Sequence, residues 1–143
     1  MEFEHLKLKA TKHEHIDVLS TLLQDSLFHH HTSQLHKDED GSVTLFLNRF
    51  CWEVYDEDDL EHYRIHSIVH ICNVTSVHVN QPMSQHDHKD FLYLLGMHST
   101  NENEIVLVFS ENKCVKLTVN DILVYMKDVD NPWITHYAPK HEI

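Results

Sequence analysis

The chain has 143 residues, of which 41% are hydrophobic and 24% charged, and this is the size and composition of one globular domain rather than a collagen-like or disordered chain. Gly41 and Gly96 are its two glycines, which excludes P-loop, dinucleotide-binding and nucleophile-elbow motifs, because each needs closely spaced glycines. The formal net charge of −12 repels phosphate backbones, so we expect no nucleic-acid partner. We expect a single domain over residues 1–143.

The cysteines and the apolar runs indicate a cytoplasmic protein. Cys51, Cys72 and Cys114 form no C-x-x-C pair, which predicts neither a disulfide framework nor a zinc ribbon. The first residues are acidic and do not resemble a secretory signal. The longest fully apolar runs, 105–109 and 122–126, are far shorter than the roughly 20 residues that span a bilayer. We expect cytoplasmic localisation, no membrane partner and no cofactor.

The N-terminal segment predicts one strand followed by one helix. Residues 6–10 alternate apolar and polar side chains, which is typical of a half-buried strand. The stretch from Thr11 to Glu14 fits a capping box, in which a hydroxyl and a carboxylate satisfy backbone N–H groups reciprocally. Apolar residues at helical spacing follow, so we predict a helix over about 12–27.

The next segments predict strands separated by polar turns. From 28 to 36 the period returns toward two, and the turn residues 38–41 precede renewed alternation, so we predict a hairpin. Residues 43–54 are apolar on both faces, as in a central strand. Residues 63–79 are rich in β-branched side chains and are predicted as strand, although part of the stretch also fits a helical face.

The C-terminal half predicts a meander closed by a helix. The polar stretch 84–90 is predicted as a loop. An antiparallel meander is predicted over three short apolar runs, 91–97, 104–109 and 114–119. Asn120 is a suitable N-cap for a short helix over 121–127, and Pro132 stops it. The element order predicts an α+β fold: an antiparallel seven-strand barrel or rolled sheet, similar to a pleckstrin-homology domain, with a helix after strand one and a closing C-terminal helix.

Short segments spread over most of the chain share a pattern with a known family. They are Leu6-Lys7-Leu8 with Ala10, Val18-Leu19-Ser20 with Leu23-Gln24-Asp25, and the most specific motif, N-R-F-x-W-E, at Asn48 to Glu53. Looser agreement continues at Arg64 to Val69, Leu94-Leu95, Val106 to Phe109, Leu117 to Val119, Asp128 and Pro132-Trp133. This set resembles a small alphaproteobacterial family catalogued only as a domain of unknown function. The resemblance implies a compact cytosolic bacterial domain and implies no activity, substrate or site residue.

Sixteen histidines suggest an alternative function in metal binding or pH response. Their protonation would change the formal charge from −12 to +4 near roughly pH 6.5. The clusters are His13 with His15, His29 to His31, His62 with His66 and His70, and His86 with His88. An H-x-H pair on one strand face can hold a divalent metal if a third ligand folds over it. No H-E-x-x-H or related zinc motif is present, so we expect no dedicated metal site.

Asn48, Arg49, Trp52 and Glu53 form a candidate interaction patch. An arginine fork and an indole face together suit a carboxylate or peptide ligand. A structural role explains the same residues: on a strand, Arg49 and Glu53 share one face, and a core aromatic pair with a cross-strand ion pair needs no ligand. We favour the structural role and keep the patch as an alternative.

No catalytic motif can be written for this chain, and an enzyme would need a pocket that only a structure reveals. We therefore expect a non-catalytic protein- or ligand-binding adaptor module. The expected partner is another cytosolic protein or a second copy of the chain. The alternative is a histidine-rich protein that binds divalent metal or responds to pH.

Overall fold

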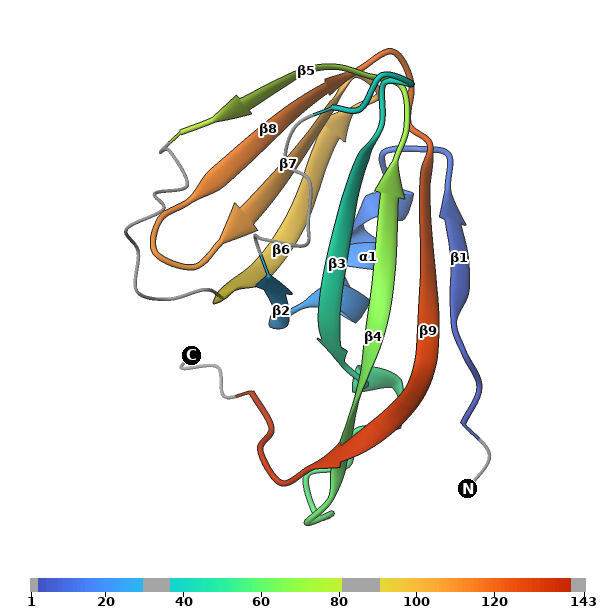
Figure 1. Ribbon diagram of the computed structural model, residues 1–143, viewed down its shortest axis with the longest axis vertical. Coiled ribbons are helices and arrows are strands. Elements are labelled where there is room, and N and C mark those ends of the chain that lie inside the picture. Colours follow the sequence, from blue (N-terminus) through green and yellow to red (C-terminus); the bar gives the residue numbers. More distant parts are fainter. Residues whose placement is uncertain (1–2, 30–36, 81–90, 140–143) are drawn as a thin grey trace.

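The computed structural model describes residues 3–29, 37–80 and 91–139 and shows a strongly bent antiparallel sheet (Figure 1). Within these ranges there are nine strands: β1 Lys7–Ala10, β2 Ser26–His29, β3 Val43–Phe50, β4 His62–Ile71, β5 Val74–Val79, β6 Phe91–Asn101, β7 Glu104–Phe109, β8 Cys114–Val119 and β9 Val124–Thr135. Their order across the sheet is β1-β9-β4-β3-β2-β6-β7-β8-β5. The helix α1, His15–Leu23, follows β1, and a 3-10 turn, Trp52–Val54, follows β3.

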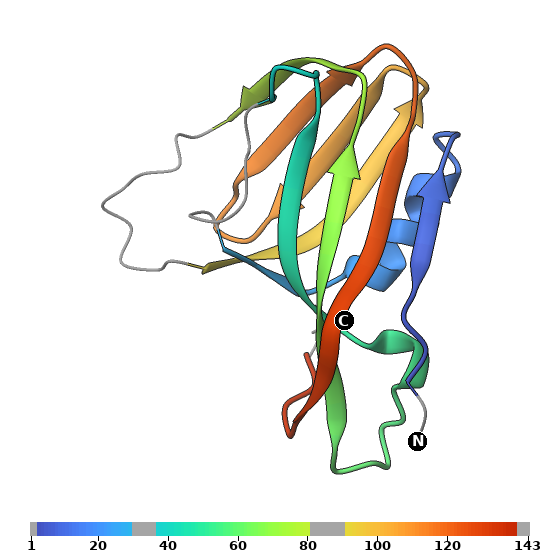
Figure 2. The same cartoon turned by 45° about the vertical axis from the view of Figure 1, so that its right-hand side comes forward.

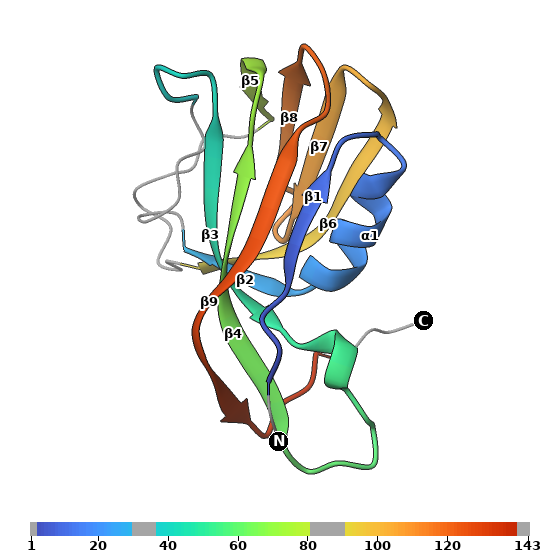
Figure 3. The same ribbon diagram turned by 90° about the vertical axis from the view of Figure 1, so that its right-hand side faces the viewer.

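The sheet bends so that its two ends form two layers. Figures 1 and 2 show β1, β9, β4 and β3 on one side and β6, β7, β8 and β5 on the other, with the short β2 linking them near one end. The helix α1 packs against β6, β3 and β1, as seen from the side in Figure 3. The two strands at the ends of the order, β1 and β5, do not pair with each other, so the sheet is open.

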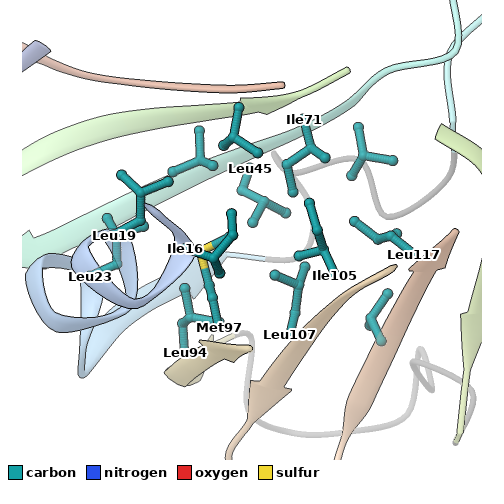
Figure 4. Close-up of a cluster of buried hydrophobic side chains, with 14 of the residues drawn as sticks. Ile16, Leu19, Leu23, Leu45, Ile71, Leu94, Met97, Ile105, Leu107 and Leu117 are labelled. Carbon is teal, nitrogen blue, oxygen red and sulfur yellow. The ribbon is translucent and has the colours of Figure 1, made fainter. Parts of the chain in front are cut away.

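The core lies between the two layers and α1. Alternate strand positions point inward, so each strand contributes buried side chains at a period of two, as at Ile105, Leu107 and Phe109 of β7. The helix contributes Ile16 and Leu19 at helical spacing, and Figure 4 shows both helical and strand side chains converging in one cluster. Full burial of each such side chain contributes roughly 1.5–3 kcal/mol, which makes this cluster the main source of stability.

The predicted first strand and the helix after it are confirmed, but the helix is shorter than expected. It begins at His15 rather than 12, and its N-terminus has no side-chain cap, so the capping box is wrong. The backbone N–H of Thr11 instead donates to His15 Nδ1 at 3.1 Å. At the other end Asp25 has a φ of 61°, which ends the helical path before β2 begins.

The predicted C-terminal helix is wrong, because residues 121–127 enter the strand β9. Val124, Met126 and Asp128 are buried while Tyr125 and Lys127 are exposed, and this alternation is that of a strand. Pairing of β9 with both β4 and β1 satisfies its backbone on two sides, which outweighs a local helical pattern.

The strand predictions over the middle of the chain are confirmed with different boundaries. The run 63–79 divides into β4 and β5 at Asn73, whose φ is 59°. The strand predicted over 43–54 ends at Phe50, and the hairpin prediction matches the antiparallel pairing of β2 with β3. The predicted meander corresponds to β6, β7 and β8. The predicted 84–90 loop and most of 28–36 lie outside the described residues.

The architecture is therefore mostly β, with one short helix in the described ranges, rather than α+β with two helices. The predicted closed barrel of seven strands is wrong, since nine strands form an open sheet. One additional strand arises because the predicted strand over 63–79 is divided into β4 and β5. The other is β9, which replaces the predicted C-terminal helix.

Candidate functional site

An apolar groove crosses the outer face of β1, β9, β4 and β3. In Figure 1 these strands lie in front of α1, so their outer face is toward the viewer. Side chains at paired positions of antiparallel strands lie on the same face. One row across the face is Lys7, Lys127, Ile68 and Phe46, and the next is Lys9, Tyr125, His70 and Thr44.

Large apolar and aromatic side chains on the outer face of the sheet line this groove and remain exposed. Phe46 is 41% exposed and Tyr125 is 42% exposed, with Ile68 between them in partly buried contact. The hollow has a volume of about 470 Å³ and is lined by Lys7, Leu8, Thr44, Phe46, Ile68, His70, Tyr125, Met126 and Lys127. Contiguous exposed apolar surface with a polar rim is a feature of protein-interaction sites.

The rim of this groove is basic, although the chain as a whole is acidic. Lys7, Lys9 and Lys127 all project from the two rows, and Lys9 Nζ lies 5.7 Å from the centre of the Tyr125 ring. None of the eight paired positions in these rows holds a carboxylate. The nearby carboxyl of Asp40 has a lowered pKa. Its main cause is the hydrogen bond from the Ser42 side chain, and His70 of the groove makes a smaller electrostatic contribution.

The candidate patch from the N-R-F-x-W-E motif is divided between two sides of β3. Arg49 is fully buried and points toward Asp128 and Glu53, whereas the side-chain oxygen of Asn48 accepts a hydrogen bond from Arg64 at 3.2 Å. The Trp52 indole N–H donates to the carbonyl of Gln24 at 2.8 Å, which ties the 3-10 turn to the end of α1.

Arg49 is the centre of a buried ion-pair cluster. Its Nε and NH2 groups donate to the two carboxylate oxygens of Asp128, each at 2.7 Å, and NH1 and NH2 donate to Glu53 at 2.8 and 2.9 Å. Ser67 Oγ and the Leu6 backbone N–H donate to the same Asp128 at 2.6 and 2.8 Å. With all three guanidinium nitrogens engaged, an external carboxylate would have to displace an internal one.

The pKa shifts in this cluster follow from its pairing. Burial is the largest single influence and would lower the pKa of Arg49 and raise that of Asp128. The hydrogen bonds and opposite charges of all their partners together outweigh burial in both cases, so the pKa of Arg49 is raised and that of Asp128 is lowered. Both groups are therefore held in their charged forms. The neighbouring Cys51 thiol has no such partner, and burial raises its pKa to about 12, so it is not a thiolate nucleophile at neutral pH.

Among the described histidines, His66 and His70 have different neighbours although both belong to β4. His66 and His70 share the outer face of β4; His66 packs on Trp133 with ring centres 4.8 Å apart, and His70 contacts Thr44 at 2.9 Å. Four further cluster members, His30, His31, His86 and His88, lie outside the described residues.

One group of potential metal ligands occurs among the described residues: His13, Glu14 and Glu102, whose ligating atoms lie within 4.8 Å of one another. In the structure His13 Nδ1 contacts Glu102 and Nε2 contacts Glu14 at 3.2 Å. The side-chain hydrogen bond with Glu102 raises the pKa of His13, which favours the imidazolium form over a metal ligand.

The sequence of this chain matches a known protein family. A sequence profile described as "Protein of unknown function (DUF2948)" matches residues 6–141. The chain belongs to the DUF2948 family. No curated protein and no solved structure matched it. No helix in the described part of this DUF2948 chain is long and apolar enough to span a membrane.

Sequence reasoning missed the groove of this DUF2948 domain, although part of its signal is visible in the sequence. The alternation in β1 assigns Lys7 and Lys9 to the same exposed face, and Phe46 and Tyr125 break the polar alternation of their strands. The pairing that brings β1 beside β9 joins segments about as far apart as the chain allows, and no local pattern predicts it.

Proposed function

We propose that this DUF2948 domain is a non-catalytic protein-binding module, and that its groove binds an acidic segment with exposed apolar side chains from another cytosolic protein. The observation that carries the proposal is the combination of exposed Phe46 and Tyr125 with Lys7, Lys9 and Lys127 on one strand face.

Charge complementarity selects the occupant. The chain has a net charge of −12, yet three of its 11 lysines and arginines gather on this face. In a bound partner segment, an acidic side chain would contact a lysine at the rim, and the apolar side chain next to it would fill the groove. The long aliphatic stems of lysine add apolar contact and leave the ammonium groups in water. The overall negative charge repels an acidic partner at long range, but salt screens that repulsion beyond roughly 8 Å, so local contacts dominate.

The surroundings of the N-R-F-x-W-E motif support a structural role for its residues, and the lining of the groove supports a binding role. Arg49 is engaged by internal carboxylates, and burial raises the pKa of both Cys51 and Cys72. The groove itself is lined by lysine, tyrosine, threonine and apolar side chains, with His70 as the one imidazole among them. This composition suits recognition of a chain segment better than bond cleavage.

A labelled peptide that copies residues 55–61 (Y-D-E-D-D-L-E) provides a suitable probe, because it combines a tyrosine and a leucine with five carboxylates. Fluorescence anisotropy should show saturable binding to the wild-type protein. The Lys7→Glu/Lys127→Glu variant should bind roughly tenfold more weakly, since it replaces two attractive charges by repulsive ones.

The matched control is Lys12→Glu/Lys37→Glu, which changes the net charge equally at two exposed lysines outside the groove. It should retain wild-type affinity. The proposal is contradicted if the peptide shows no saturable binding, or if both double variants lose affinity to the same extent. Light scattering of the wild-type protein separates a second copy of the chain from a different protein as partner.

The alternative function, divalent-metal binding, is favoured by the His13, Glu14 and Glu102 group. If it holds, equilibrium dialysis with Zn²⁺ should show one equivalent fewer bound in His13→Ala/Glu102→Gln than in the wild type. Unchanged uptake would remove this site as the metal centre.

A further inference from the structure

A second hollow lies on the sheet near the end of β9, separate from the groove. It has a volume of about 620 Å³ and is lined by β2 and β6, by Arg64 of β4 and by the segment that follows β9. Figure 1 shows that the end of β9 turns back toward β2; the last residue of β9, Thr135, and Tyr137 of the segment that follows it contribute to the lining. The volume is within the roughly 300–1,000 Å³ of small-molecule sites.

An irregularity in the sheet sets the position of Arg64. Arg64 pairs with Trp133, but His66 pairs with Val129, so β9 carries extra residues opposite Ile65. Within this bulge Asp130 has a φ of 64°. Bulges redirect neighbouring side chains and are frequent beside functional sites.

The guanidinium of Arg64 lies in the cleft beside Asn48 and Phe50. Its NH1 group donates to the backbone carbonyl of Asn48 at 3.1 Å and to the Asn48 side-chain oxygen at 3.2 Å, and its Cζ lies 5.6 Å from the centre of the Phe50 ring. It forms no ion pair with any carboxylate in the described ranges. By contrast Arg49, which is next to the Phe50 that pairs with Arg64, has two carboxylate partners.

Partial burial makes the Arg64 guanidinium a favourable anion site. Arg64 is partly buried, and burial lowers its pKa even though nearby groups, among them Tyr93 and Asp25, act in the opposite direction. A partly desolvated guanidinium gains more from a bidentate carboxylate than an exposed one does. Asn48 orients one edge of the fork, which leaves Nε and NH2 for a ligand.

We propose that this cleft binds a small monocarboxylate with an apolar body, held by Arg64 through its carboxylate. Leu27 and Leu95 supply apolar lining for the body of the ligand, and the Tyr93 and Tyr137 side chains flank it. Asp25 also lines the cleft, and its negative charge disfavours ligands that carry more than one anionic charge, such as phosphate or a dicarboxylate.

The binding can be measured by isothermal calorimetry or by amide shifts in NMR spectra, with hexanoate as the probe and hexanamide and inorganic phosphate as comparisons. Hexanoate should bind at millimolar concentrations or below, and hexanamide at least about tenfold more weakly, because it lacks the charge that pairs with Arg64. Equal binding of the acid and the amide, stronger binding of phosphate, or no binding of hexanoate overturns the proposal.

Two variants test the site by independent routes. Arg64→Gln removes the cation, and Leu95→Trp fills the cleft from a residue that is 44% exposed and leaves Arg64 in place. Both should lose hexanoate binding, and Leu95→Trp still decides the matter if Arg64→Gln does not fold. Lys127→Gln removes the same charge from the groove, so it should retain hexanoate binding. Hexanoate binding that survives Leu95→Trp contradicts the assignment to this cleft.

Discussion

Arg49 and Asp128 lie 79 residues apart in sequence and form a bidentate ion pair whose side chains are both fully buried. The pair joins β3 to β9, two strands separated in the sheet by β4. Ser67 of β4 donates to the same carboxylate, so one buried group connects three neighbouring strands beneath the outer face that carries the groove.

Removing the charge of Asp128 should destabilise the fold strongly. Asp128→Asn leaves Arg49 buried with half of its pairing lost and turns an amide N–H toward the guanidinium, so the free energy of unfolding should fall by about 3 kcal/mol or more. Urea unfolding measures it. Asp130→Asn is the control, since its side chain is 77% exposed, and it should change stability by less than about 0.5 kcal/mol. Equal, small effects of both variants would contradict the buried pair.

Stability should fall in acid because of the same carboxylate. The pKa of Asp128 is lowered in the folded state, against the effect of burial, by the hydrogen bonds from Arg49, Ser67 and Leu6. A lowered folded pKa means that this stabilisation is fully present above the unfolded pKa of about 3.9 and is lost as pH falls through the folded value. Urea unfolding between neutral pH and pH 3 should show a steeper loss of stability for wild type than for Asp128→Asn. Parallel pH profiles would show that another group controls the acid transition.

Thiol labelling should separate the cysteines. Cys51 is 1% exposed and burial raises its pKa to about 12, whereas Cys72 and Cys114 are partly exposed. A disulfide reagent at neutral pH should therefore label Cys51 only after denaturant is added. Single-cysteine variants identify each site, and rapid labelling of Cys51 in the folded protein is the contradictory result.

Gly96 and Ser20 should be energetically coupled. A β-carbon at Gly96 would lie 3.2 Å from Ser20 Oγ, which accepts a hydrogen bond from the Met97 backbone N–H at 2.9 Å. Gly96→Ala should cost about 1 kcal/mol in the wild type, and less in a Ser20→Ala background where the hydroxyl is absent. A double-mutant cycle by urea unfolding measures the coupling. Additive effects would mean that α1 and β6 do not touch here.

Local alternation in the sequence was sufficient to predict most strands, because a strand with one buried face repeats every two residues. It failed at 121–127, where apolar residues fit both a helix and a strand and only pairing with β4 and β1 decides. The helix over-prediction has a similar cause, since Leu27 fits the helical spacing but lies in β2 and pairs with Asn48 of β3.

The functional surfaces were less accessible to sequence reasoning than the strands. The motif around Arg49 predicts a cross-strand ion pair in general terms, but its partner on another strand, Asp128, is contributed by the far end of the chain, and the local pair with Glu53 forms only because the chain turns after β3. No local sequence pattern around Arg64 indicates a binding site. Its cleft depends on the bulge in β9 and on the path of the segment after β9. Tertiary pairing creates both sites, so local periodicity cannot reveal them.

The most direct test of the binding proposal is to map the 55–61 peptide on the protein by amide chemical shifts. The account predicts the largest shift changes on β1, β3, β4 and β9, at Lys7, Phe46, Ile68 and Lys127, with saturation at one peptide per chain. Changes confined to β5 to β8, or to the cleft around Arg64, would contradict the assignment of the groove as the protein-binding site.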